Sequence, residues 1–248
     1  MALVRRPRWL LGNLAEVGAF GLHFVALRRG SLLLVQTVLV SGLLFALPLG
    51  AAMSRRRLRT EEWLGALAVV IGLAVFLGVG VPTRGRGETS GLAWAVVLGL
   101  GGALAAALVV TAPRRPGEAR ATHLGAACGI LFGLDAALTK ASGHLLNRGL
   151  WHALSAWEPY ALVALAAVGF LLAQSAFQAG SLGASLPVLT IADPLVAALI
   201  GVLVFHERMA ATPVALVAEM GAVLAMILGV IVLARSPIVV PDTAVPAP

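Results

Sequence analysis

Charged residues are scarce in this sequence: Asp, Glu, Lys and Arg together make up 12% of its 248 residues. A soluble domain of this size would carry about a quarter of its residues as charged side chains. Hydrophobic residues account for 60% instead, and they gather in long runs that short, arginine-containing breaks separate. This composition excludes an ordinary soluble domain and predicts an all-α protein that crosses a lipid bilayer several times.

Cysteine is almost absent as well. The single Cys128 lies inside an apolar run, so the sequence offers no disulfide framework and no Cys/His spacing for zinc. It contains no Gly-x-Ser-x-Gly, no His-Glu-x-x-His and no Walker Gly-x-x-x-x-Gly-Lys-Ser/Thr motif. We therefore expect neither an enzyme nor a resident cofactor or metal, and no ATP-driven pump.

Eight apolar stretches are long enough to cross a hydrocarbon core of about 30 Å, which takes roughly 20 helical residues. They are residues 9–27, 31–53, 63–81, 92–112, 124–142, 161–179, 184–205 and 213–234. The connection at 144–160 is too polar to span, and its aromatic residues suit the membrane interface. Residues 1–235 are thus predicted to form one transmembrane domain, and the proline-rich tail at 236–248 is predicted to be disordered.

The arginines predict the orientation. Seventeen of the eighteen basic residues are arginine, and eleven of them lie in breaks on one side of the predicted membrane against six on the other. By the positive-inside rule both termini are cytoplasmic. The net charge of +7 then reflects topology, and we expect no nucleic acid partner. The bias toward Arg, Ala and Gly favours a GC-rich bacterial source, which would place the protein in the cell membrane.

Two parts of the chain resemble each other. Gly30-Ser31-Leu32 and Gly180-Ser181-Leu182 each begin a long apolar run, followed by a charged break and a glycine-containing apolar helix. The first repeat covers residues 9–81 and the second 124–234, joined by a connecting span at 92–112. The copies are offset by an odd number of spans, so they would face opposite ways across the membrane. Inverted repeats are common in secondary transporters, whose substrate sites lie near the membrane midplane.

The predicted span 184–205 contains a carboxylate, Asp193, and two prolines. Pro194 lacks a backbone donor and frees the carbonyl of Thr190, while Pro187 adds a second irregularity. Ionisable groups inside a membrane are costly and usually functional. We therefore expect Asp193 and Thr190 to bind a cation or a substrate amine, or to carry a proton. The alternative is a buried aspartate that only fixes the kink.

Other polar residues also fall inside predicted spans. Glu16 and His23 share one face of the first span, either as part of a proton path or as a packing contact. Asp135 lies deep in the fifth span, whereas Lys140 is near its outer end and can snorkel to the interface. One of these two is expected to line a cavity.

Three glycines, Gly125, Gly129 and Gly133, are spaced four residues apart and predict a close contact with a neighbouring helix. Glu219 is a further cavity candidate in the last span. Gln174 could bind substrate, but contact between helices is the simpler role. Glu207, at the end of a span, is expected at the interface or as a helix cap.

Four segments carry a resemblance to a known family: Arg5-Arg-Pro-Arg-Trp-Leu-Leu-Gly12, Gly30-Ser-Leu-Leu-Leu-Val-Gln36, Gly129-Ile-Leu-Phe-Gly-Leu-Asp-Ala-Ala-Leu-Thr-Lys140, and Leu186-Pro-Val-Leu-Thr-Ile-Ala-Asp-Pro194 with Phe205-His-Glu207. They resemble the drug/metabolite transporter superfamily, and most of all its EamA-like actinobacterial members near the NIPA-type magnesium transporters. Thr37 stands where a proline would match Pro187. The family would also supply a helix before Trp9.

This resemblance implies a secondary transporter with inverted repeats, which moves a small metabolite or drug-like solute by alternating access, with or without proton coupling. One alternative is a permease for Mg²⁺ or another divalent cation, in which Asp193 and Glu16 would hold the metal. A second is a non-transporting or truncated membrane protein. The expected partners are the lipid bilayer and a small-molecule or ion substrate, and a homodimer stays open.

Overall fold

The structure, a computed structural model, describes residues 7–40, 42, 45, 59–79, 85, 90–114, 117–180, 182–207 and 212–234. Its helices are α1 (Pro7–Arg29), α2 (Leu32–Val40), α4 (Thr60–Val79), α5 (Gly91–Thr111) with a 3-10 turn at Ala112–Arg114, α6 (Gly117–Arg148), α7 (Leu150–Ser155), α8 (Glu158–Ala179), α9 (Leu182–Leu203) and α10 (Pro213–Ala234). Every regular element in these ranges is a helix, so the all-α prediction is confirmed for the described part of the chain.

Hydroxyl side chains cap the first turns of α2 and α10. The Oγ of Ser31 accepts a hydrogen bond from the N–H of Leu34 at 3.1 Å, directly before α2. The Oγ1 of Thr212 accepts from the N–H of Ala215 at 3.3 Å, directly before α10. Amides of the first turn have no partner within the helix, so these side chains stabilise the first turns.

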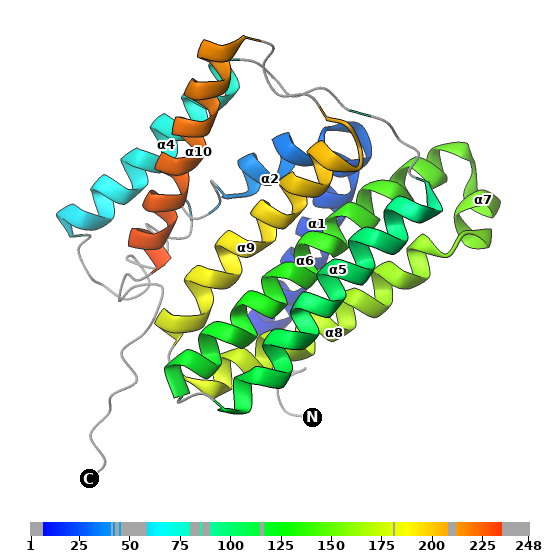
Figure 1. Cartoon of the computed structure of the whole chain (residues 1–248), viewed down its shortest axis with the longest axis horizontal. Coiled ribbons are helices and arrows are strands. Elements are labelled where there is room, and N and C mark those ends of the chain that lie inside the picture. The colour runs from blue at the N-terminus through cyan, green and yellow to red at the C-terminus, as the bar shows by residue number, and fades with distance from the viewer. Residues whose placement is uncertain are drawn as a thin grey trace.

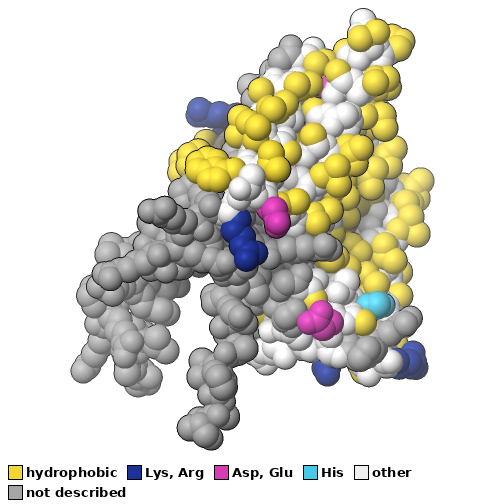
Figure 2. Space-filling view, turned by 90° about the vertical axis from the view of Figure 1, so that its left-hand side faces the viewer, with side chains coloured by type: hydrophobic (Ala, Val, Ile, Leu, Met, Phe, Trp, Pro, Cys, Tyr) yellow, Lys and Arg dark blue, Asp and Glu magenta, His cyan; other side chains and the backbone are white. Residues whose placement is uncertain are grey.

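Four described segments are long and apolar enough to cross a membrane: Gly91–Arg114, Gly117–Arg148, Glu158–Ala179 and Pro213–Val232. Shorter apolar helical segments occur at Trp63–Phe76 and Val188–Leu203. Many large apolar side chains on these helices are exposed, and Figure 2 shows hydrophobic side chains spread over one face. Such a surface suits lipid rather than water. The predicted tail at 236–248, and most of the second half of the predicted span 31–53, lie outside the described residues.

The connection predicted at 144–160 is largely helical. α6 continues for 32 residues to Arg148, and α7 follows after Gly149. Gly149 has a φ of 127°, a conformation that is easy only for a residue without Cβ, so the chain can turn sharply here. Trp151 and Trp157 are exposed in this region, as the interfacial prediction requires.

α6 is the central helix of the bundle. It packs against α9, α8, α5 and α1 (Figure 1), and much of its length between Ala121 and Gly143 is buried. α2 packs on α9, α4 pairs with α10, and α10 also contacts α9. This arrangement brings α1, α2, α6 and α9 together.

The glycines Gly125, Gly129 and Gly133 lie in the contact between α6 and α9. A Cβ added at Gly129 would be 2.6 Å from the Cβ of Ala192, and one at Gly133 would be 2.8 Å from the carbonyl oxygen of Asp193. These separations leave no room for a side chain, so the two backbones touch directly. The glycines thereby hold the Asp193 segment of α9 against α6.

Candidate functional site

α1, α2, α6 and α9 line a cavity of about 140 Å³, which we call the acidic cavity. Its lining residues are Phe20 and His23 from α1, Gln36 from α2, Phe132, Asp135, Ala136 and Thr139 from α6, and Asp193 from α9. Three residues singled out in the sequence, His23, Asp135 and Asp193, therefore meet although they belong to three helices. Gln36 and Thr139 complete the polar lining and were not anticipated.

Three residues that line the acidic cavity each carry a buried oxygen atom without a hydrogen-bond partner among the described residues. The Oε1 of Gln36, the Oδ1 of Asp135 and the Oδ1 of Asp193 are each buried and unpaired among the described residues. Leaving a buried polar atom unsatisfied costs about 1–3 kcal/mol, so such atoms call for a water, an ion or a ligand that pairs with them. All three are acceptors. The cavity therefore suits a ligand that is a cation or that donates hydrogen bonds.

The charge of the acidic cavity points the same way. Two carboxylic acids line it, and neither lysine nor arginine is among its described lining residues. A water molecule occupies about 30 Å³ in the liquid, so the cavity could hold a few waters, a small cation with part of its hydration shell, or a small amine. The size and sign of the site favour small donors over bulky anions.

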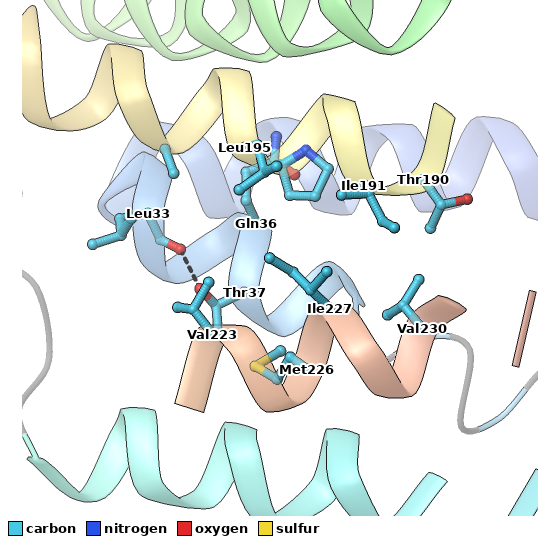
Figure 3. Close-up of a pocket in the computed structure, with 12 residues that line it drawn as sticks. Leu33, Gln36, Thr37, Thr190, Ile191, Leu195, Val223, Met226, Ile227 and Val230 are labelled. Atoms are coloured by element: carbon cyan, nitrogen blue, oxygen red, sulfur yellow. Dashed lines mark hydrogen bonds between the residues drawn. The ribbon is translucent and has the colours of Figure 1, made fainter. Parts of the chain in front are cut away.

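An apolar cavity of about 70 Å³ lies next to the acidic cavity. It is lined by Leu33, Gln36, Thr37, Thr190, Ile191, Pro194, Leu195, Ala198, Val223, Met226, Ile227 and Val230 (Figure 3). Gln36 borders both cavities. Thr190 and Pro194 line only the apolar one, so the structure does not bring Thr190 into the acidic lining beside Asp193. The Thr37 hydroxyl donates to the carbonyl of Leu33 at 2.8 Å within α2.

A wider groove lies between α1 and α2. Its volume is about 700 Å³, and its described lining is Ala19, Leu22, His23, Ala26, Arg29, Gly30, Leu34, Val35, Val38, Leu39, Gly42 and Phe45. His23 lines both this groove and the acidic cavity. The imidazole thus stands at the boundary between the two spaces.

A buried ion pair joins α6 to the segment after α9. The carboxylate of Glu207 accepts hydrogen bonds from the N–H groups of Leu32 at 2.5 Å and Leu33 at 2.8 Å, the first residues of α2. The ammonium of Lys140 pairs with the same carboxylate, and both side chains are 0% exposed. The Lys140 Nζ also lies 4.7 Å from the ring centroid of Phe205. We call this group the Lys140–Glu207 cluster.

The Lys140–Glu207 cluster corrects one interpretation made from the sequence and agrees with another. Lys140 does not snorkel to the surface, because its side chain is fully buried. Glu207 is buried and caps a helix, namely α2, which is one of the two roles expected for it. Burial of each charge is tolerable because the other neutralises it and backbone amides satisfy the carboxylate.

The remaining candidates lie elsewhere. Glu219 is fully buried in α10 and lines none of the cavities described above. Gln174 is exposed on α8, so it does not face the acidic cavity. The side chains of Glu16 and Pro187 lie outside the described residues. Within the part of the chain that the structure describes, there is no group of three or more His, Cys, Asp or Glu residues suited to a metal ion.

In the part of the chain that the structure describes, the protein is all-helical, has four helical segments long and apolar enough to cross a membrane, and has a cavity lined by two acids between α1, α2, α6 and α9. An uncharacterized protein of Corynebacterium glutamicum is 36% identical to this chain over 233 residues, which cover 93% of this chain and 80% of the relative. The chain belongs to the same family as this corynebacterial protein. No protein-family model matches the chain. No solved structure matches it.

Proposed function

We propose that this protein is a secondary transporter of the cell membrane, which moves a small hydrogen-bond-donating solute or a cation by alternating access. The acidic cavity is the observation that carries the proposal, since its three unpaired acceptor oxygens need a ligand. Asp193 lies about midway along α9, as expected for a transporter site near the membrane midplane. The resemblance to EamA-like members of the drug/metabolite transporter superfamily agrees with this function.

A reciprocal contact between α4 and α10 supports inverted repeats as part of the proposal. A Cβ at Gly72 would lie 2.7 Å from the carbonyl oxygen of Ala222, and one at Gly229 would lie 2.6 Å from that of Gly65. Gly72 follows Gly65 by seven residues, and Gly229 follows Ala222 by the same interval. Matched contacts of this kind are expected where a two-fold axis relates two copies. Gly72 and Gly229 lie in the two glycine-containing apolar helices that follow the charged breaks in the repeats predicted from the sequence.

The segments that begin the two matching apolar runs, in α2 and α9, also contact each other. α2 belongs to the first repeat, α9 to the second, and the two helices pack on each other. Gln36 of α2 and Asp193 of α9 both line the acidic cavity. If the two segments are inverted copies, the proposed site lies between them, which is where transporters built from inverted repeats bind their substrates.

The proposed chemistry is simple. The donor groups of the solute replace the missing partners of Gln36, Asp135 and Asp193, and the two acids balance its positive charge. A solute arriving through the groove between α1 and α2 would pass His23, which lines both spaces. A proton held by one of the acids could exchange with the solute, which would couple transport to protons.

A divalent-cation permease is a second candidate. Asp135 and Asp193 line one cavity, and each has a buried carboxylate oxygen without a hydrogen-bond partner among the described residues. Mg²⁺ is commonly held by one or two carboxylates while it keeps several waters, and a small polar cavity suits that arrangement. In this version the metal is the transported substrate.

Flux measurements test the proposal. The purified protein is placed in vesicles that contain a pH-sensitive dye or, in a separate experiment, a magnesium-sensitive dye. Small amines or Mg²⁺ are then added outside, and the enclosed dye reports their entry. We expect Asp193→Asn and Asp135→Asn each to reduce flux by about 10- to 100-fold, because hydrogen bonds to charged groups contribute about 1.5–3 kcal/mol. Glu61→Gln is the matched control, since Glu61 is an exposed acid on α4.

The outcomes separate the candidates. Amine flux without Mg²⁺ flux selects the organic solute, and the reverse selects the permease. Full flux in folded Asp193→Asn protein would remove this residue from the mechanism. A wild-type protein that moves neither probe under any gradient would favour the non-transporting alternative.

The proposed orientation predicts a labelling pattern. The single Cys128 is replaced by serine, and a new cysteine is placed either at the exposed Ser155 beyond α6 or at the exposed Thr60 at the start of α4. With both termini cytoplasmic, we expect a membrane-impermeant maleimide to label Ser155→Cys in intact cells. Thr60→Cys should react only after permeabilisation. The opposite pattern would invert the topology.

A further inference from the structure

Glu207 occupies a closely fitted position between two glycines. Its backbone N–H donates to the carbonyl of Gly201 at 2.9 Å, which folds the chain back onto the end of α9. A Cβ at Gly201 would lie 2.8 Å from the Oε2 of Glu207, and one at Gly85 would lie 2.9 Å from its Cγ. His206 has a φ of 54°, which is unusual for a residue other than glycine. The backbone is thus shaped to direct this carboxylate inward.

The Lys140–Glu207 cluster lies one helical turn from the acidic cavity on two helices. On α6, Lys140 directly follows Thr139 and comes four residues after Ala136, and both of these line the cavity. On α2, Leu32 precedes the cavity residue Gln36 by four residues. The cluster therefore ties α2 to α6 at one end of the cavity. That end belongs to the outer side in the proposed topology.

The bonds of the cluster differ in kind from the contact that holds α6 against α9. The glycine contact joins the two helix backbones directly, with Gly129 against the carbonyl oxygen of Leu189 and Gly133 against that of Asp193, and it contains no pair of charged side chains. In a buried ion pair, by contrast, the loss of hydration largely offsets the attraction between the charges. When such a pair opens to water, hydration compensates both charges and the freed amides of α2. An ion pair of this kind can therefore alternate between two states at modest cost, whereas separating the close-packed backbones at the glycines gains no comparable hydration.

From these observations we propose that the Lys140–Glu207 cluster is the outer gate of the acidic cavity, and that release of the α2 amides by Glu207 opens the cavity to the outer side. The ion pair and both amide bonds are formed in this structure. Opening frees the first turn of α2 and so moves Gln36, which removes one wall of the cavity. This inference rests on the proposed transport function for its purpose, but the opening itself can be measured without any solute.

Accessibility of a cavity residue tests the gate. In protein with Cys128→Ser, the lining residue Ala136 is replaced by cysteine, and its reaction with an impermeant maleimide is followed from the outer side. Glu207→Gln keeps the size of the side chain. It removes the negative charge that pairs with Lys140, and it replaces one of the two acceptor oxygens with an amide group. We expect labelling to become about tenfold faster, because a lost charge-assisted hydrogen bond shifts a two-state equilibrium by roughly that factor.

A second pair of variants isolates the backbone bond. Leu32 is the first residue of α2, a position where proline is well tolerated because its missing N–H has no partner within the helix. Leu32→Pro removes the N–H that donates a hydrogen bond to Glu207 and leaves the ion pair between Lys140 and Glu207 in place. Leu32→Ala loses a buried side chain as well but keeps the N–H. We expect faster labelling of Ala136→Cys with Leu32→Pro and not with Leu32→Ala.

A reporter at Ser155→Cys should react equally fast in all backgrounds, since this residue is exposed and outside the cluster. Unchanged labelling of Ala136→Cys in folded Glu207→Gln and Leu32→Pro proteins would overturn the gate and make the cluster a static connection. That result would not affect the flux tests of Asp135 and Asp193. Conversely, if labelling becomes faster but the protein shows no flux, the proposed transport function is wrong while the opening of the cavity is supported.

Discussion

Glu207→Ala is expected to lower stability by about 3–5 kcal/mol, because removing one partner of a buried ion pair leaves the other charge uncompensated. The remaining charge is the ammonium of Lys140, whose side chain is completely buried. The same substitution deprives the N–H groups of Leu32 and Leu33 of their acceptor, and loss of a helix cap costs about 1 kcal/mol. Survival of folded protein after heating in detergent, followed by gel filtration, measures the loss.

Combining Glu207→Ala with Lys140→Met should recover most of this stability. Methionine fills much of the space of the lysine stem without a charge, and apolar replacement of a buried ion pair is often close to neutral. Only the cap of α2 stays lost, so we expect a remaining deficit of about 1 kcal/mol. A double variant as unstable as Glu207→Ala alone would show that loss of the cap, and not loss of the carboxylate beside Lys140, dominates the cost. Lys140→Met alone keeps the cap but leaves the buried Glu207 carboxylate without its counter-ion, so it should be less stable than the double variant.

Sequence patterns identified the acids of the cavity but not the arrangement that joins them. Asp193, Asp135 and His23 were recognisable because an ionisable group in an apolar run is costly unless it is used. Periodicity places each on a face of its own helix, yet it does not say which faces meet. Gln36 was missed for that reason: a single amide in a short apolar helix becomes informative only when α9 and α6 are placed beside it.

The Lys140–Glu207 cluster shows the same limit more sharply. Snorkelling is the natural expectation for a lysine near the end of an isolated span, because burial alone would be prohibitive. Its partner Glu207 is 67 positions away along the chain, so the cost of burying the lysine charge is offset only when the folded bundle brings the two side chains together. One signal was present, since Lys140 is the single lysine among eighteen basic residues. Where arginine serves every loop, a lone lysine inside an apolar span has a different role.

Gly129→Ala is expected to destabilise the bundle by about 1–3 kcal/mol through overpacking. The added methyl would lie 2.6 Å from the Cβ of Ala192 and 2.8 Å from the carbonyl oxygen of Leu189. Neither atom belongs to the end of a flexible side chain, so relief requires α9 to move away from α6. Alanine favours helix over glycine by up to about 1 kcal/mol, which offsets only part of this cost.

Gly99→Ala on α5 is the matched control, because an added Cβ there meets nothing within 4 Å and Gly99 is exposed. We expect this variant to be as stable as the wild type or slightly more stable in the same heating assay, so the comparison isolates the α6–α9 contact.

Displacement of α9 would also shift Asp193 relative to Asp135, so Gly129→Ala should lose flux even at temperatures where it stays folded. If Gly129→Ala matched Gly99→Ala in both stability and flux, α9 would have to be free to slide on α6. In that case the acidic cavity would not depend on a fixed contact between α6 and α9, and α9 would move in addition to the outer gate.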